Sequence, residues 1–127
     1  MDIKSLEKLN NIDPRLKLLC EEVFKISKVK FIITEGLRTK ERQEQLFQLK
    51  KTMTMNSKHL TGKACDFCPI VNSKIDFNAR DDIMFLCGIF YTKAKELNIS
   101  IRIGCIWDNQ SIKENKFIDA YHLELQN

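Results

Sequence analysis

The sequence predicts an α+β fold in one domain, with a small antiparallel sheet packed against helices. Segments with helical spacing and β-branched segments are segregated along the chain and do not alternate as regular strand–helix–strand units. The length of 127 residues suits one domain, and such a chain buries about two-thirds of its unfolded surface. We therefore expect residues 1–127 to form a single domain.

Three segments have the apolar spacing and the end signals of helices. Asp13 and Pro14 are typical of a helix start, because aspartate caps free amides and proline suits the first turn. Thr39 can cap a second helix in the same way. A long amphipathic helix is predicted over 78–97, and Asn98 is suited to its end.

β-branched and aromatic segments predict the strands of the sheet. These segments are 30–34, 64–68, 100–106 and 121–125. Pro69 is expected to end the second strand, because proline cannot donate to a ladder of hydrogen bonds. We predict loops over 51–58 and 108–116 and a connection over 71–77.

The composition is that of an ordinary globular protein. Hydrophobic residues make up 43% of the chain and charged residues 30%, which excludes a disordered chain. The net charge of +4 suits work near a polyanion. A nucleic-acid module is disfavoured, because the sequence has no arginine-rich stripe or aromatic platform. The longest apolar run, 83–91, is shorter than the roughly 20 residues that span a bilayer, and no export signal begins the chain.

The five cysteines are expected to be reduced, because their number is odd and no export signal is visible. Cys20 and Cys87 fall on apolar helix faces and are predicted to lie in the core. Cys65 and Cys68 form a CxxC pair, which leaves a structural zinc site as an alternative. That alternative is weak, because it needs a second ligand pair with finger-like spacing.

Both histidines of the chain lie beside carboxylates. His59 is followed by Asp66, and His122 is flanked by Asp119 and Glu124. Two imidazoles and one carboxylate make a three-ligand zinc site with one open position, which is typical of catalytic rather than structural zinc. A further acid could then serve as general base.

The alternation of side chains along strands assigns these residues to faces. Asp66 is expected to face the site, and Cys65 the core. His122 and Glu124 share one face of the last strand, whereas Asp119 must lie on the loop that enters it. From there Asp119 could reach a metal-bound water. Glu124 could orient His122, contact a substrate or be an ordinary surface acid.

These stretches resemble the zinc D,D- and L,D-peptidases of cell-wall metabolism, which share their fold with the hedgehog signalling domain. The residues that carry the resemblance are Ser57-x-His59-x-x-Gly62-x-Ala64-x-Asp66 and Asp119-x-x-His122-x-Glu124. The resemblance covers residues 31–125. An aspartate at position 119 makes the chain most similar to the phage endolysins that cleave the L-alanyl–D-glutamate bond.

The resemblance implies a role for each residue. His59, Asp66 and His122 would bind one Zn²⁺ per chain, and Asp119 would be the general base and proton shuttle. Arg38 would stabilise the oxyanion or hold a substrate carboxylate, which suits a guanidinium. The supporting residues are Ser57, Gln43, Trp107 and Glu124. Trp107 follows Gly104-Cys105-Ile106 where many phage members carry Gly-Gly-Asp-Trp, so one acid of that pattern is missing.

The implied function is hydrolysis of the peptidoglycan stem peptide. Two alternatives stay open: a D,D-carboxypeptidase or D-Ala-D-Ala dipeptidase, and a non-catalytic metal-containing binding domain of the same fold. The presence of Asp119 favours an enzyme. We expect a monomer with no cell-wall-binding domain, no nucleic-acid partner and no stable membrane insertion. The resemblance also implies synthesis in the cytoplasm of a bacterial host, release aided by a membrane-permeabilising protein, and action on the cell wall.

Overall fold

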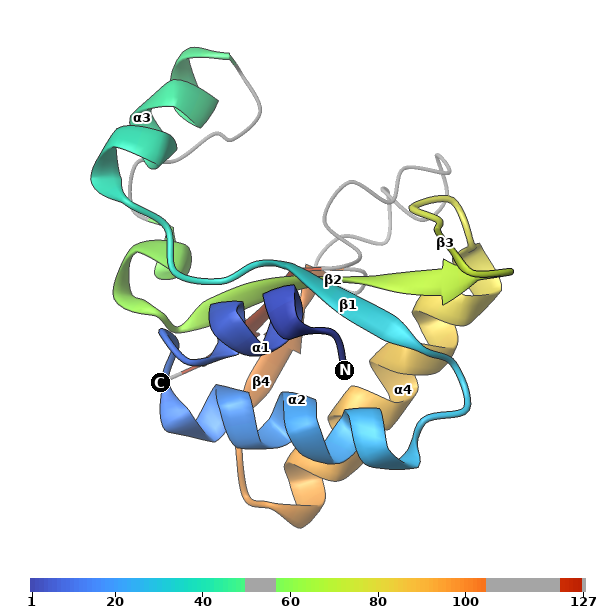
Figure 1. Ribbon diagram of the computed structural model, residues 1–127. Helices are drawn as coiled ribbons and strands as arrows, with labels where there is room; N and C mark the ends of the chain where they lie inside the picture. The colour runs from blue at the N-terminus through green and yellow to red at the C-terminus, as the bar shows by residue number, and fades with distance from the viewer. Residues whose placement is uncertain (50–56, 105–121, 127) are drawn as a thin grey trace.

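The structure is a computed structural model that describes residues 1–49, 57–104 and 122–126. Its helices are α1 (Ile3–Leu9), α2 (Pro14–Ile26), α3 (Lys40–Gln48), the short 3₁₀ helix η1 (Lys58–Thr61) and α4 (Arg80–Glu96). Its strands are β1 (Phe31–Glu35), β2 (Ala64–Val71), β3 (Lys74–Ile75), β4 (Ile101–Ile103) and β5 (His122–Leu125). The predicted α+β class with a small antiparallel sheet is confirmed (Figure 1).

The strand order β1-β2-β5-β4 decides which parts of the sequence meet. β5 lies between β2 and β4 and is antiparallel to both. In this register Asp66 of β2 lies opposite His122 of β5, and Cys65 lies opposite Leu123. The two histidine-bearing stretches therefore become neighbours, although they are far apart in the sequence.

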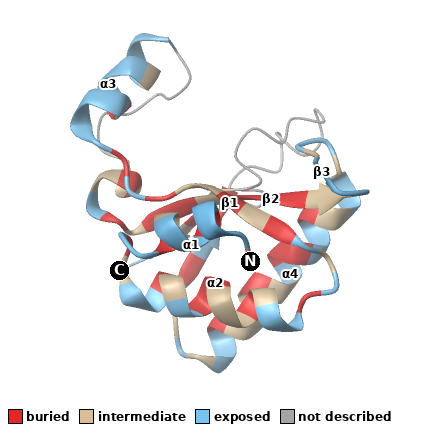
Figure 2. Ribbon diagram, in the orientation of Figure 1, coloured by how far each residue is buried: buried red, intermediate tan, exposed pale blue. Residues whose placement is uncertain are grey.

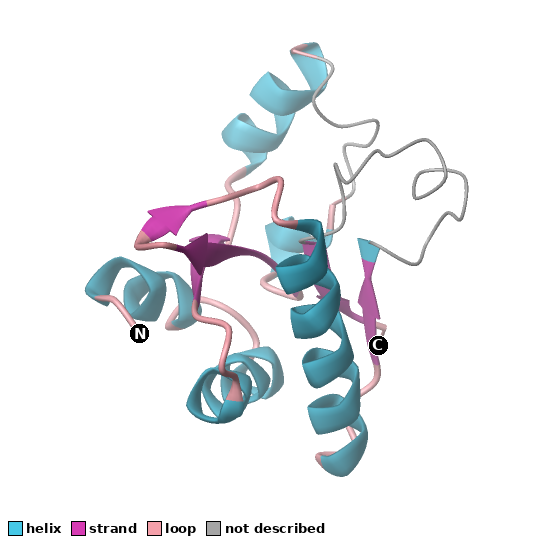
Figure 3. Ribbon diagram, turned by 90° about the vertical axis from the view of Figure 1, so that its right-hand side faces the viewer, coloured by secondary structure: helices cyan, strands magenta, loops and turns pink. Residues whose placement is uncertain are grey.

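One face of the sheet packs against α2 and α4 to form the core (Figures 2 and 3). The strand residues on this face follow one another at every second position, because side chains alternate along a strand. They are Phe31, Ile33, Cys65, Phe67, Ile101, Ile103, Leu123 and Leu125. Asp66 and His122 are paired on the other face, so the polar residues of the sheet are separated from the core.

Three aromatic rings join the sheet to α4. Phe31, Phe67 and Phe90 are each at most 1% exposed. Their ring centroids are 6.3, 5.6 and 4.9 Å apart. Such tilted and edge-on contacts add to the free energy of apolar burial. Cys20 and Cys87 also lie in this core, as predicted.

The sequence patterns above do not predict α1, which covers the outer edge of β1. The Ile33 amide donates to the Ser5 hydroxyl at 2.9 Å, and Lys8 Nζ donates to the Ile33 carbonyl at 3.3 Å. These bonds occupy backbone groups that an edge strand otherwise exposes. The apolar spacing of α1 is a weak helix signal in the sequence, because the helix buries Ser5 and Leu9 while Leu6 stays 40% exposed.

The predicted helix ends are confirmed. The Asp13 side chain accepts from the Arg15 amide at the start of α2, and Thr39 accepts from the Arg42 amide at the start of α3. Asn98 follows α4 with a left-handed φ of 57°. Within α3, which projects from the body in Figure 1, the buried residue is Gln43.

The prediction that Pro69 ends its strand is wrong, because β2 continues to Val71. The Ile70 amide donates to the Lys30 carbonyl at 2.8 Å, on the β1 side of the strand. The nitrogen of Pro69 therefore points to the opposite side, where pairing with β5 has already ended at Asp66. On that side the Pro69 carbonyl accepts from the Asp76 amide at 3.1 Å, one residue beyond the end of β3. The missing N–H therefore falls at the end of the β2–β3 ladder, where a proline is tolerated.

The predicted connection over 71–77 contains a hairpin that we did not predict. Val71 pairs with Lys74, and the turn between them has Asn72 at φ 52° and Ser73 at φ 66°. Two left-handed turn residues match a type I′ hairpin, for which asparagine is a recognisable signal. Of the predicted loop over 51–58, residues 51–56 lie outside the described residues and Lys58 begins η1. The predicted loop over 108–116 also lies outside the described residues. No helix in the described ranges is long and apolar enough to cross a membrane.

We predict that Phe90→Ala lowers the free energy of unfolding by about 3–5 kcal/mol, because it removes a fully buried ring. Phe85→Ala is the matched control, since Phe85 lies on the same helix and is 49% exposed. Its cost should stay below about 1 kcal/mol. Urea unfolding followed by circular dichroism measures both, and equal costs would contradict this account of the core.

Candidate metal centre

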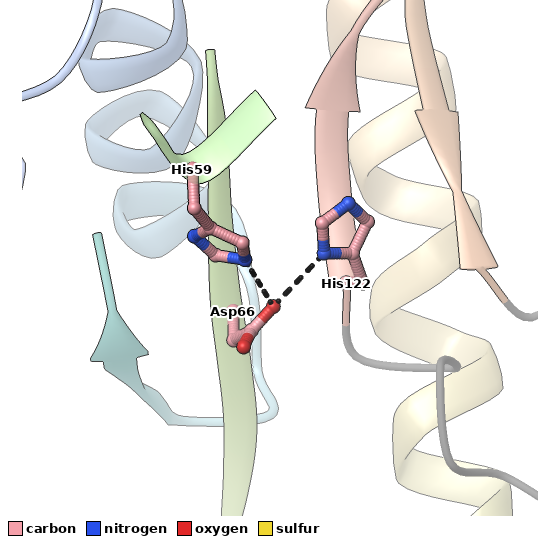
Figure 4. A group of neighbouring side chains, drawn as sticks. All are labelled: His59, Asp66 and His122. Atoms are coloured by element: carbon pink, nitrogen blue, oxygen red, sulfur yellow. Dashed lines mark hydrogen bonds and ion pairs between the residues drawn. The ribbon is translucent and has the colours of Figure 1, made fainter. Parts of the chain in front are cut away.

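His59, Asp66 and His122 come together on the polar face of the sheet (Figure 4). They come from η1, β2 and β5, and one ligand atom from each lies within 4.8 Å of the others. Within the described ranges, these three side chains form the group that could hold a metal ion. The structure thus brings together the three residues that the sequence indicates as ligands.

A single carboxylate oxygen is the centre of the group. Asp66 Oδ1 lies 3.2 Å from Nε2 of His59 and 3.1 Å from Nδ1 of His122. The two imidazole rings approach edge to face, with centroids 5.0 Å apart. His59 is only 1% exposed, so the group is closed on one side by protein.

The proton of neutral His59 is assigned by a backbone carbonyl. Nδ1 of His59 lies 2.8 Å from the Gly36 carbonyl oxygen, which can only accept a hydrogen bond. Nδ1 must therefore carry the proton. The lone pair of Nε2 is then directed at Asp66.

His122 is held in the same way but through its other nitrogen. Nε2 of His122 lies 3.0 Å from Oε1 of Glu124, and an ionised carboxylate can only accept. The proton of the neutral ring is therefore on Nε2, and the lone pair of Nδ1 is directed at Asp66. Of the three roles considered for Glu124, this contact supports the orientation of His122.

Two lone pairs and one carboxylate oxygen thus point at one another. This arrangement is repulsive unless a cation lies among them. The donors fit a divalent metal ion, because each imidazole has a second partner that fixes its orientation. Without a metal, a proton can lie between the three groups, and it shifts the pKa values of Asp66 and His122.

Burial tends to raise the pKa of Asp66, but its contacts with His122 and His59 lower it to about 2. Burial tends to lower the pKa of His122, but its contacts with Asp66 and Glu124 outweigh this effect and raise it. The metal-free centre therefore favours a positive charge on His122. The same field favours a metal cation.

Two glycines position the turn that carries His59. A Cβ atom on Gly36 would lie 2.7 Å from the carbonyl oxygen of Lys8 in α1, so any side chain there would displace the strand end. Gly62 has a left-handed φ of 73°, and its carbonyl accepts from the Asp13 amide at 2.9 Å. The turn is therefore supported by both N-terminal helices.

Ser57 and Gln43 have local contacts that agree with supporting roles. The Ser57 hydroxyl accepts from the His59 amide at 3.2 Å and caps η1. Gln43 is fully buried, and its Oε1 accepts from Nη1 of Arg38 at 2.7 Å. Neither contact tests a role towards a substrate.

Arg38 is held beside the centre by Glu35, an acid that is not among the predicted site residues. Its Nε and Nη2 donate to the two carboxylate oxygens of Glu35 at 2.7 and 2.8 Å. Glu35 lies opposite Asp66 in the sheet, and the Arg38 amide donates to the His59 carbonyl at 2.8 Å. The spacing of three residues between Glu35 and Arg38 is the signal that could have indicated this pair.

The structural zinc site considered for the CxxC pair receives no support. Cys65 lies in the core with its sulfur 3.8 Å from that of Cys20, and this contact together with burial raises its pKa. Burial also raises the pKa of Cys68 to about 11. Both thiols therefore resist the ionisation that metal ligation requires. Trp107 and Asp119 lie outside the described residues and stay predictions.

The pKa shifts predict how the stability of the metal-free protein depends on pH. A raised pKa means that protonated His122 contributes stability fully below its ordinary pKa of 6.5, and that this contribution is lost as pH rises. The pKa of Asp66 is lowered instead, so ionised Asp66 contributes stability above its ordinary pKa of 3.8. This contribution is lost only as the pH falls from 3.8 towards about 2. Of these two groups, only His122 changes between about pH 6 and 8.

We therefore expect the chelator-treated protein to melt at a lower temperature at pH 8 than at pH 6, by an amount that shrinks in His122→Gln. Metal affinity should change in the opposite direction, because protons compete for the ligand nitrogens at low pH. Thermal unfolding at both pH values measures the first effect. The same pH dependence in wild type and His122→Gln would contradict it.

We also predict that Gly36→Ala weakens binding of a divalent metal ion by roughly 10–100-fold, because it displaces the carbonyl that orients His59. Gly88→Ala is the matched control, since a Cβ atom there meets nothing within 4 Å. Competition with a chromogenic chelator measures the affinity of each protein. Wild-type affinity in Gly36→Ala would show that the carbonyl has no such role.

Comparisons with known proteins agree with this geometry. The sequence model of a family described as phage L-alanyl-D-glutamate peptidase matches residues 1–126. The L-alanyl-D-glutamate peptidase of Escherichia phage T5 is 30% identical over 129 residues, which cover 95% of this chain and 93% of the phage protein. The crystal structure of the Serratia marcescens L-Ala D-Glu endopeptidase ChiX is similar with a TM-score of 0.86 and 25% identity, over 99% of this chain and 89% of that chain. The resemblance found in the sequence is confirmed, and the chain belongs to the phage L-alanyl-D-glutamate peptidase family.

Proposed function

We propose that this chain is a zinc-dependent peptidoglycan peptidase that hydrolyses the L-alanyl–D-glutamate bond of the stem peptide. The observation that carries the proposal is the convergence of His59, Asp66 and His122 in a member of a family described by that activity. The same ligand set would serve other peptidases of this fold. The family membership is what favours this particular bond.

The donor set and its spacing support zinc as the metal. Two imidazole nitrogens and one carboxylate oxygen suit Zn²⁺, and three protein ligands leave one position open for chemistry. With bonds of about 2.0–2.1 Å, tetrahedral ligands lie roughly 3.3 Å apart. The observed separations of 3.2 and 3.1 Å from Asp66 to the two imidazoles fit this spacing. Bound at this position, zinc supplies Lewis acidity that polarises a carbonyl and acidifies water.

Asp119 is the proposed general base. It would take a proton from the attacking water and pass it to the leaving amine of D-glutamate. Support comes from its position in the sequence, because it precedes His122 by three residues. Three residues span at most about 10 Å, so a base at this position of the sequence is within reach of the metal centre.

Arg38 is the proposed electrophilic group. A guanidinium has five N–H groups, and the described residues engage three of those of Arg38. The other two can bind the oxyanion that forms at the scissile carbonyl, or a carboxylate of the substrate. Glu35 and Gln43 would hold the guanidinium in place for this purpose, and we propose Trp107 as a wall of the substrate site.

The remaining features of the proposal concern the setting in which the enzyme works. We propose one zinc ion and one catalytic domain per chain, a monomeric state, and peptidoglycan as the partner. Synthesis would take place in the host cytoplasm, and a membrane-permeabilising protein would give access to the cell wall. Support for this setting is membership of a phage family.

Digestion of purified peptidoglycan tests the proposal. We expect new termini with L-alanine carboxyl groups and D-glutamate amino groups, identified by mass spectrometry after labelling. Release of terminal D-alanine alone would instead identify a D,D-carboxypeptidase. A purified protein that binds no zinc would refute the metal assignment.

Asp119→Asn tests the proposed general base independently of the metal ligands. It should lower kcat by about 10²–10⁴-fold, because no carboxylate accepts the proton, while zinc content stays at the wild-type level. His59→Ala should lose both zinc and activity. Asp81→Asn, an exposed aspartate in the first turn of α4, is the matched control and should keep both. Full activity in Asp119→Asn would remove this residue from the mechanism.

A further inference from the structure

We propose that Lys58 is a positioning residue for the metal centre and that it acts through Glu124 on His122. Nothing in the sequence motifs gives Lys58 a role. The inference rests on the proposed function only in that it takes His59, Asp66 and His122 as metal ligands. It does not depend on which peptide bond is cut.

The Lys58 side chain connects the two segments that carry the histidines. Lys58 precedes His59 in η1, and its Nζ reaches across to β5. There it lies 3.1 Å from Oε2 of Glu124 and also donates to the Leu125 carbonyl oxygen. One ammonium group therefore binds both a side chain and the backbone of the strand that begins with His122.

Glu124 uses its two oxygens for different partners. Oε2 pairs with Lys58, and Oε1 accepts from Nε2 of His122 at 3.0 Å. The Glu124 side chain is only 13% exposed, so water competes poorly for either oxygen. With both oxygens engaged, the plane of the carboxylate is fixed. A fixed carboxylate in turn fixes the ring plane of His122 and the direction of its Nδ1 lone pair.

Lys58 also offsets the negative charge of Glu124, the second carboxylate beside His122. Asp66 and Glu124 both contact the His122 ring, one at each nitrogen. Two acids around one ring repel each other, and an imidazole without a metal does not offset both charges. The ammonium group of Lys58 neutralises Glu124 from the side away from His122. The charge of Asp66 then remains available for the metal.

An ordinary surface ion pair is the competing interpretation, since the Lys58 side chain is 36% exposed and such pairs contribute little to stability. The chain offers a direct comparison in Lys93 and Glu96 of α4. These residues are also 3.1 Å apart, but the Glu96 side chain is 59% exposed. Neither residue belongs to the metal-ligating group within the described ranges. The two pairs therefore have the same N–O distance, but they differ in the burial of the acid and in their connection to the metal centre.

Zinc affinity provides the test, measured by chelator competition on Lys58→Met, Lys58→Arg, Glu124→Ala, the Lys58→Met/Glu124→Ala double variant, and Lys93→Met. We expect Glu124→Ala to weaken zinc binding by roughly 10–100-fold and Lys58→Met by about tenfold. Lys58→Arg should restore most of the affinity, because it keeps the charge. Lys93→Met should bind zinc as the wild type does. Lys58→Gln removes the same charge and replaces Lys58→Met if that variant does not fold.

The double variant distinguishes action through Glu124 from a general structural effect. If Lys58 acts through Glu124, the Lys58→Met change should cost no further affinity once Glu124 is alanine. The inference would be overturned if the double variant lost affinity by the product of the two single losses. Wild-type affinity in Lys58→Met would also overturn it. The visible spectrum of the Co²⁺-loaded protein should also change in Lys58→Met and recover in Lys58→Arg, because it reports ligand geometry.

The outcomes also separate this inference from the proposed function. A wild-type protein without measurable zinc affinity would overturn both. Zinc binding with the expected Lys58 effect, but without cleavage of peptidoglycan, would overturn only the proposed function. Cleavage of peptidoglycan with wild-type zinc affinity in Lys58→Met would overturn only the role of Lys58.

Discussion

The pairing of β2 with β5 is the constraint on which the rest of the structure depends. It places Asp66 opposite His122 on one face and Cys65 opposite Leu123 on the other. A slip of one residue would exchange the faces and bring the charged groups into the core. The apolar residues therefore fix the register, and the register fixes the ligands. Core and site are two faces of one set of backbone hydrogen bonds.

Each imidazole at the centre is oriented by a partner outside the metal-ligating group. A backbone carbonyl selects Nε2 of His59 for the metal, and a carboxylate selects Nδ1 of His122. These partners differ in kind, because the Gly36 carbonyl belongs to a strand end held by α1, whereas Glu124 is a charged side chain that needs a counter-charge. The two ligands thus depend on different parts of the molecule, the N-terminal helix for one and the Lys58 ammonium for the other.

Features of the site that depend on local sequence were predictable, and those that depend on distant contacts were not. Capping by Asp13 and alternation around Asp66 follow from short spacings, and both agree with the structure. The continuation of β2 through Pro69 depends on where a neighbouring strand ends, which the residue itself does not reveal. The contact of Lys58 with Glu124 joins residues that only the folded sheet makes neighbours. The proposed general base, Asp119, lies outside the described residues, so its placement is still a prediction.

The position of β5 between β2 and β4 has a consequence for assembly. β2 and β4 do not pair with each other, so the sheet is incomplete until a strand from late in the sequence enters the space between them. The same strand buries Leu123 and Leu125 and supplies His122. Because these contacts join distant parts of the chain, they are costly to form early in folding. Completion of the core and completion of the ligand set are therefore one event, and a partly folded intermediate that lacks β5 would have neither a closed core nor a full metal centre.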